Sequence, residues 1–427
     1  MYKGFKKVIT LTLSVIMLAS ILLGANVHAA DKVKIEFWYG LGSNAGAKME
    51  ELIARFNESQ DEVEVTGVAF GNYSEVEQKI QASMAAGNVP GGFMAGERTV
   101  KDYGEDGLIA EITQFANESD IWDESDFLEV FMNQAKGWDD ETLYAIPSWG
   151  TTQIMYYNKE VYEKAGVDPE WAFESWENLR EASKKIVESG AAKYGHLPMW
   201  GSGNLVDMAL SNGGEYMNED RTEYLVNQPE WVEAWDFIRE MVFEDKTAVI
   251  NSGGQGWEYW YKTIDMVMNG EAASYTGSSG DMGDLDFEKI GAFEQPGMNG
   301  HEARPSAGAN FLVIPSNQDK EKQIAAFKWY TYFTSPEIAA EWSMLTGYIP
   351  ARKSTMEVPE YKDYIKENPH AEVPYKQSLH AHPGFLEPSQ GEFSDALEVA
   401  ADQVELQNTP AQKALDEAAK KATEALK

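Results

Sequence analysis

The chain has 427 residues and no cysteine, and its 35 Lys and Arg residues face 70 Asp and Glu residues. The net charge of -35 argues against binding to nucleic acid or anionic lipid, because both require a basic protein surface. The lack of cysteine excludes disulfides, thiolate metal sites, cysteine nucleophiles and thioether lipid anchors. An apolar fraction of 43% allows large buried cores, and the length suggests about two or three structural units.

Residues 1–30 predict an export signal. Three lysines lie among the first seven residues, residues 8–23 are mainly apolar, and Val27-His28-Ala29 resembles a small-residue cleavage pattern. The apolar run is short for a membrane span of about 20 residues, so we expect cleavage rather than retention as an anchor. The sequence therefore predicts a periplasmic or secreted protein that is not lipid-anchored.

Predicted strands and helices alternate along the first part of the mature chain. Residues 33–39 alternate apolar and polar side chains, as a half-buried strand does, and residues 49–56 place apolar side chains at helical spacing. A short strand at 63–65 leads to a helix for which Ser74 and Glu77 predict a capping box.

The alternation continues to the C-terminus. The apolar strand 154–157 is expected to end at Asn158, a helix cap, and Ser175 is expected to cap a later helix. Pro336 predicts a helix start and Gly347 its end. Such alternation predicts an α/β fold with a mostly parallel sheet and helices on its faces.

Signatures of catalytic, metal and nucleotide chemistry are poor. The segment His301-Glu302-Ala303-Arg304 lacks the second histidine of a zinc-protease helix. The serines of Gly277-Ser278-Ser279-Gly280 do not have nucleophile-elbow spacing. We therefore expect no catalytic residue, no metal and no cofactor, although so many acidic residues leave a glycosidase carboxylate pair open.

Aromatic residues beside glycines or in predicted loops are the most informative feature. Aromatic rings pack on the C–H faces of sugars, while carboxylates, amides and hydroxyls bind the sugar hydroxyls. A single ring of this kind is more often part of a core edge. Several together in an exported α/β chain favour a ligand cleft; they are Trp38, Trp138, Trp149, Trp200, Trp257 and Tyr348.

Several stretches, in their order and spacing, resemble the extracellular solute-binding proteins of ABC importers, within the large sugar-binding group (family 1). They are 84–90, 154–159 followed by 165–169, and 335–342 closed by 346–350. The resemblance implies two α/β lobes of the periplasmic-binding-protein fold, joined by a hinge, with a ligand cleft between them. It places residues 31–150 with 311–346 in one lobe and residues 151–310 with 347–427 in the other.

Within that group the chain is most similar to glycerol-3-phosphate-binding and sugar-binding members. The resemblance implies that Glu97 accepts hydrogen bonds from two ligand hydroxyls, and we expect Trp38 and Trp200 to stack on the ligand. His380 stands where an arginine is expected to meet the phosphate, and a neutral histidine is a poor substitute. This difference favours a neutral sugar or polyol, as does the negative field of the protein. The other implied contacts are Tyr73, Thr151, Ser279, Gly308 and Tyr348.

We therefore expect the extracytoplasmic substrate-binding component of an ABC importer, which captures a sugar or polyol and delivers it to the permease subunits in the membrane. We expect a monomer with no nucleic-acid partner. Three alternatives remain open: a binding protein for glycerol-3-phosphate or a glycerophosphodiester, a secreted glycoside hydrolase, and a sensor-input protein with the same fold and ligand.

Overall fold

The computed structural model describes residues 32–255, 257–389 and 391–426. The expected export signal, residues 1–30, lies outside these ranges. None of the helices within them combines the length and the apolar character needed to cross a bilayer.

The strands of the described chain form one network in the order β2-β1-β3-β7-β4-β5. Strand β1 pairs in parallel with β2 and β3, whereas β7 runs antiparallel to both β3 and β4. The first half of β4 pairs with β7 and its second half with β5 and β6. The strands are β1 (Val33–Tyr39), β2 (Val63–Ala69), β3 (Gly92–Ala95), β4 (Ala145–Asn158), β5 (Ser274–Ser278), β6 (Ile290–Phe293), β7 (Ser306–Val313), β8 (Ile349–Pro350) and β9 (His382–Pro383).

The prediction of a mostly parallel sheet is wrong. Among the strands of the described residues, β1 pairs in parallel with β2 and β3, and β7 with the short β9. The long strands β4 and β7 instead run antiparallel through the middle of the molecule, and β4 continues from one half of the network into the other. The alternation of helices and strands in the sequence could not reveal the antiparallel pairing. It does not show which strands become neighbours or in which direction they run.

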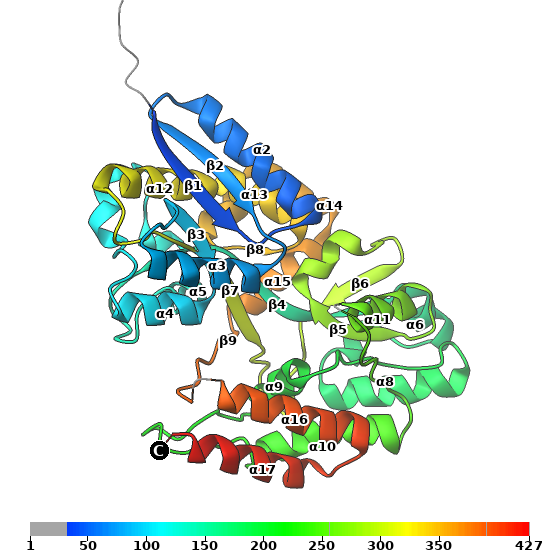
Figure 1. The fold of residues 1–427 in the computed structure, drawn as a ribbon. Helices are drawn as coiled ribbons and strands as arrows, with labels where there is room; N and C mark the ends of the chain where they lie inside the picture. The colour runs from blue at the N-terminus through cyan, green and yellow to red at the C-terminus, as the bar shows by residue number, and fades with distance from the viewer. Residues whose placement is uncertain (1–31, 256, 390, 427) are drawn as a thin grey trace, which may run out of the picture.

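Helices surround both halves of this network (Figure 1). Those of the N-terminal half and of the segment after β7 are α2 (Ser43–Ser59), α3 (Tyr73–Ala86), α4 (Glu97–Glu105), α5 (Glu129–Gln134), α12 (Lys320–Phe333), α13 (Pro336–Thr346), α14 (Pro359–Glu367) and α15 (Val373–Ser378). The others are α6 (Lys159–Ala165), α7 (Pro169–Ala172), α8 (Trp176–Ser189), α9 (Ser202–Ser211), α10 (Pro229–Phe243), α11 (Glu258–Met268), α16 (Glu392–Gln407) and α17 (Ala411–Glu424).

Two large hydrophobic cores lie on either side of the crossing strands. The first includes Phe37 on β1, Leu52 on α2 and Trp329 on α12, all fully buried. The second includes Trp231 and Trp235 on α10 and the apolar faces of α16 and α17. Figure 1 shows β1 and β2 at one end, α10, α16 and α17 at the other, and β4 and β7 between. The fold is therefore two-lobed α/β, as predicted.

The segment after α13 stays with the first core before the chain reaches the second. Ile349 and Ala351 belong to the first core, and Tyr361 on α14 packs with Ala340 on α13. Helices α16 and α17 then complete the second core. The expected lobe boundaries, with all of 347–427 in the second lobe, remain a prediction.

Several local predictions are confirmed, and one is wrong. The Asn158 side chain caps α6 by accepting from the Val161 N–H at 3.1 Å, and Gly347 ends α13 with a φ of 75°. The Ser74–Glu77 capping box does not form, because Asn72 caps α3 two residues earlier by accepting from the Glu75 N–H. This earlier start places Tyr73 at the first position of α3.

Candidate functional site

The crossing of β4 and β7 lines a cavity of about 510 Å³, within the size range of small-molecule sites. Thr151 on β4 and Gly308 on β7 are partners in the antiparallel ladder, and both line the cavity. A Cβ placed on Gly308 would have no atom within 4 Å, so the space beside this residue is open. The strands that join the two lobes thus also form part of the cavity wall.

Three hydroxyl groups meet at the Thr151 end of this wall. Thr151 Oγ1 lies 3.2 Å from Ser278 Oγ and 3.2 Å from Ser279 Oγ. Ser278 ends β5, and Ser279 is the buried first residue of a short 3-10 helix, Ser279–Asp284. Each hydroxyl can donate one hydrogen bond and accept others, so the group can adapt to the hydroxyls of a guest.

Aromatic rings form another part of the cavity wall. The rings of Tyr216 and Phe385 stack with centroids 4.2 Å apart and an angle of 8° between them. Trp260 on α11 also lines the cavity, and its indole N–H donates to Asp281 at 2.9 Å. Sequence reasoning missed these rings, although Phe385 directly follows Gly384, the same glycine signal that singled out the other aromatic residues.

A smaller cavity of about 220 Å³ shares Phe385 with the first. It is lined by Glu97 and Lys101 on α4, in the first lobe, and by Arg221 in the second. Burial raises the pKa of Glu97 to about 7, although Lys101 and Arg98 oppose this shift. The Glu97 carboxyl can therefore change its protonation state near neutral pH.

One buried acid, Asp207, lines the larger cavity, and a second, Asp281, bonds the lining residue Trp260. Asp207 accepts from the Ser306 N–H at 2.9 Å and from Gln295 Nε2 at 2.7 Å. Burial raises the pKa of Asp207 to about 6 and that of Asp281 to about 7. In both residues, burial favours the neutral acid in the folded protein.

The raised pKa of Asp281 leads us to predict how folding stability depends on pH. A buried acid with a raised pKa stabilises the folded state below its unfolded pKa of about 4, and this contribution is lost as the pH rises through the folded value. Asp281→Asn keeps the shape but cannot ionise. We expect the free energy of unfolding of this variant to rise relative to wild type between pH 4 and 7, as measured by chemical denaturation. Parallel profiles over this range would contradict the prediction.

Tyr73 and Tyr348 lie on the first-lobe side of the crossing strands. Tyr73 is 39% exposed, yet desolvation of its hydroxyl and then the nearby Tyr348 raise its pKa, while a hydrogen bond with the Asn310 side chain on β7 lowers it. The Tyr348 ring stacks on the buried Trp149, with centroids 5.9 Å apart, and lies against Gly280. The structure thus brings Thr151, Ser279, Gly308 and Tyr348 together around the crossing strands.

Trp38, Trp200 and His380 do not line the larger cavity. The Trp38 indole donates to Glu36 at 3.0 Å, and its ring lines a separate cavity of about 240 Å³. The Trp200 indole donates to Asp402 on α16 at 2.7 Å. His380 Nδ1 faces the Ala303 carbonyl at 2.9 Å and its Nε2 faces Glu294 at 2.7 Å, and Glu294 raises the pKa of His380. The direct ligand contacts of all nine predicted residues remain predictions.

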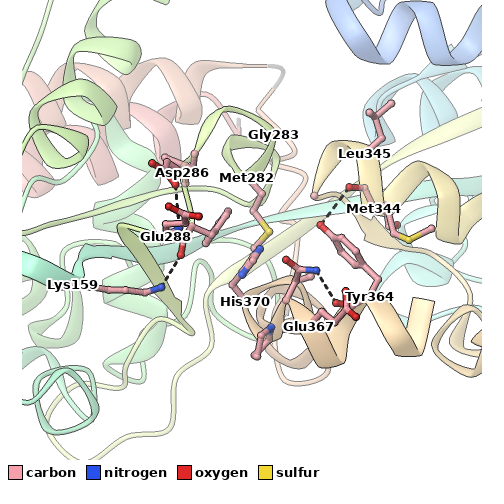
Figure 2. A pocket seen from close by; sticks show the side chains of 17 residues that line it. Lys159, Met282, Gly283, Asp286, Glu288, Met344, Leu345, Tyr364, Glu367 and His370 are labelled. Atoms are coloured by element: carbon pink, nitrogen blue, oxygen red, sulfur yellow. Dashed lines mark hydrogen bonds between the residues drawn. The ribbon is translucent and has the colours of Figure 1, made fainter. Parts of the chain in front are cut away.

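A cavity of about 540 Å³ with a different lining lies between the segment before β6 and the helices around α14 (Figure 2). Its polar groups bond to the chain itself: Lys159 Nζ donates to the Phe287 carbonyl at 2.7 Å, and the Tyr364 hydroxyl to the Met344 carbonyl at 3.5 Å. The Phe287 ring stacks on His370 with centroids 3.4 Å apart. None of the sequence-predicted contacts lines this cavity, so we place the candidate site at β4 and β7.

Comparison with known proteins decides the family. The profile of bacterial extracellular solute-binding proteins matches residues 51–372. The chain belongs to this family. Relatives of this solute-binding protein include the sn-glycerol-3-phosphate-binding periplasmic protein UgpB of Shigella flexneri, which is 27% identical over 389 residues and covers 87% of this chain and 86% of the relative. UgpB of Escherichia coli K12 is 26% identical, also over 389 residues, with the same coverage of both chains.

Solved structures support the two-lobed periplasmic-binding-protein fold. UgpB from Mycobacterium tuberculosis, in complex with glycerophosphocholine, superposes with a TM-score of 0.78 at 22% identity, covering 92% of this chain and 98% of that one. The cyclic alpha-maltosyl-1,6-maltose binding protein from Arthrobacter globiformis gives 0.77 at 18% identity, covering 92% and 99%. The resemblance to the solute-binding proteins of ABC importers is confirmed, and these relatives are named as binding proteins rather than enzymes.

Proposed function

We propose that this solute-binding protein captures a neutral sugar or polyol at the β4–β7 crossing and delivers it unchanged to the permease subunits of an ABC importer. The proposal rests chiefly on one observation. The larger cavity combines the hydroxyls of Thr151 and Ser278 with the stacked Tyr216–Phe385 pair. Such a wall matches a sugar, whose C–H faces pack on aromatic rings and whose hydroxyls need partners.

The charge of the larger cavity supports a neutral guest. Among the described residues that line it, Asp207 and Glu398 are acidic and none is a lysine or an arginine. A fixed cation favours an anionic guest, and a bidentate arginine is a particularly strong partner for phosphate. His380, expected at that position, is instead engaged by Glu294.

A glycerol phosphate ester is the second candidate, because the smaller cavity contains Lys101 and Arg221. Both cations already have partners: Lys101 Nζ bonds the Gly137 carbonyl at 3.3 Å, and Arg221 bonds the Leu386 carbonyl at 3.4 Å. Glu97 and Asp140 line the same cavity and offset the positive charge. We therefore favour the neutral sugar or polyol.

The proposal also covers the oligomeric state and the location of the protein. The protein acts as a monomer outside the cytoplasmic membrane after removal of the export signal, and with no cysteine it offers no residue for a thioether lipid anchor. Its relatives carry periplasmic names, which supports this location.

A thermal-shift screen tests the function. A ligand that binds only the folded state raises the melting temperature, by an amount that grows with its concentration above the Kd. We expect shifts with neutral saccharides or polyols, no shift with glycerol-3-phosphate or glycerophosphocholine, and no new reducing ends after incubation with oligosaccharides. A shift with glycerol-3-phosphate alone would contradict the neutral ligand, and new reducing ends would indicate a glycosidase.

We expect ligand affinity to depend on pH through the ionisation of Glu97. The ionised carboxylate offers both oxygens as acceptors and forms stronger hydrogen bonds with ligand hydroxyls than the neutral acid does, so affinity for the best saccharide should rise as the pH increases through about 7. Glu97→Gln should remove this rise and lower the affinity at pH 8 about tenfold, the loss expected for one charged hydrogen bond. Titration calorimetry from pH 6 to 8.5 measures both effects. Glu105→Gln, at the exposed end of α4, should behave as wild type. A wild-type affinity that is constant with pH would refute this role.

A further inference from the structure

An exposed aromatic cluster lies at the start of α11. The Trp257 side chain is 64% exposed, and Tyr259 and Trp260 follow it. The Trp257 ring lies 5.9 Å from Trp260 and 6.3 Å from Tyr259, measured between centroids. Large apolar groups gathered at the surface usually mark an interaction site. The sites assigned so far do not use Trp257.

This cluster is continuous with the larger cavity. Trp260 lines the cavity, and Tyr259 packs edge-on against Trp200 with centroids 5.2 Å apart. Glu398, another lining residue, is close enough to Tyr259 to contribute to its raised pKa, after the larger effect of burial. We call Trp200, Trp257, Tyr259 and Trp260 the aromatic rim.

Two of the rim rings are held in place by buried or half-buried acids. The Trp260 indole donates to Asp281 at 2.9 Å, and the Trp200 indole donates to Asp402 at 2.7 Å. Glu398, beside them, accepts from the Ser202 hydroxyl at 2.5 Å. Rings fixed in this way lose little freedom when a ligand packs on them, and the carboxylate can accept from ligand hydroxyls.

We propose that the aromatic rim binds further sugar units of the same guest outside the larger cavity, so that the ligand is an oligosaccharide rather than a monosaccharide or a small polyol. This inference rests on the proposed function. The rim repeats the chemistry of the cavity wall, with ring faces for C–H groups and a carboxylate for hydroxyls. Because the rim is continuous with the cavity, we expect it to bind the sugar units that follow the unit held in the cavity.

The test compares affinity with chain length in two glucose-based series, the maltose series and the cellobiose series, each from one to five units. Titration calorimetry of the mature chain should show, in at least one series, affinity that rises at least about tenfold from one unit to the longer members, the effect of one added aromatic contact. Trp257→Ala should remove most of this gain and leave the affinity for one unit unchanged. Trp257→Phe, which keeps an aromatic face, should retain the gain.

The outcomes separate this inference from the proposed function. Leu379→Ala removes a side chain that is 62% exposed and lies outside the rim, and it should change nothing. If saccharides bind but Trp257→Ala leaves every affinity unchanged, the rim has no role and the proposed function stands. The rim is equally excluded if affinity does not grow with chain length, or if Trp257→Ala alters only self-association. If neither a saccharide nor a polyol binds the wild type, both proposals fail.

Discussion

Gly308→Leu is expected to abolish ligand binding while leaving the fold intact. Gly308 lies opposite Thr151 in the β4–β7 ladder, and a Cβ there would meet no atom within 4 Å. The larger side chain therefore enters the cavity rather than the core, and it occupies space that the guest requires. We expect the affinity to fall at least about 100-fold, a loss of about 2.8 kcal/mol, in a calorimetric titration.

Two glycine variants control for this interpretation. Gly308→Ala should fold normally and bind with a smaller loss, because a methyl group takes up little of the cavity. Gly150→Ala is the opposite case, since its Cβ would lie 1.9 Å from the ring of the buried Phe131. That variant should lose stability, which thermal unfolding measures. Wild-type affinity in Gly308→Leu would show that the guest binds elsewhere.

Phe385→Ala is expected to lower affinity about thirtyfold, equal to about 2 kcal/mol, the scale of an aromatic hot spot. Phe385 lines both cavities and presents a ring already stacked on Tyr216, so its removal takes away a flat apolar surface that the two cavities share. Phe385→Tyr should keep most of the affinity. Titration with the best saccharide measures all three proteins.

The chain offers a matched control for this variant. Phe287 also stacks on a neighbouring ring, His370, but lines the cavity of Figure 2 instead. Phe287→Ala should leave affinity unchanged if the β4–β7 crossing is the site. Equal losses in Phe287→Ala and Phe385→Ala would mean that the substitutions act on the fold rather than on ligand contacts.

The regular elements near the site could be predicted because their signals are local. The helix caps at Asn158 and Ser175 depend on residues three positions away, and both form. Thr151 and Ser279 meet because Thr151 lies within β4 and Ser279 directly follows β5, which pairs with β4. The antiparallel pairing of β4 with β7 joins residues more than 150 positions apart, so no local pattern reveals it.

The pairing of rings in the aromatic wall could not be predicted for a similar reason. Phe385 lies between β9 and α16, in a segment without helical or strand periodicity, and its partner Tyr216 comes from a distant loop. Trp200 stands beside glycines, as a stacking residue would, but its indole bonds Asp402, about 200 positions later. The identity of a ring is therefore visible in the sequence, whereas its orientation depends on partners that only the fold supplies.

A crystal structure of the mature chain, grown with the saccharide that gives the largest thermal shift, tests the central claim most directly. We predict an intact, uncharged guest whose hydroxyls contact Thr151 and Ser278 and whose ring packs on Phe385, with no density in the cavity of Figure 2. A guest found only between Lys159 and His370, or a guest recovered in cleaved form, would contradict the account.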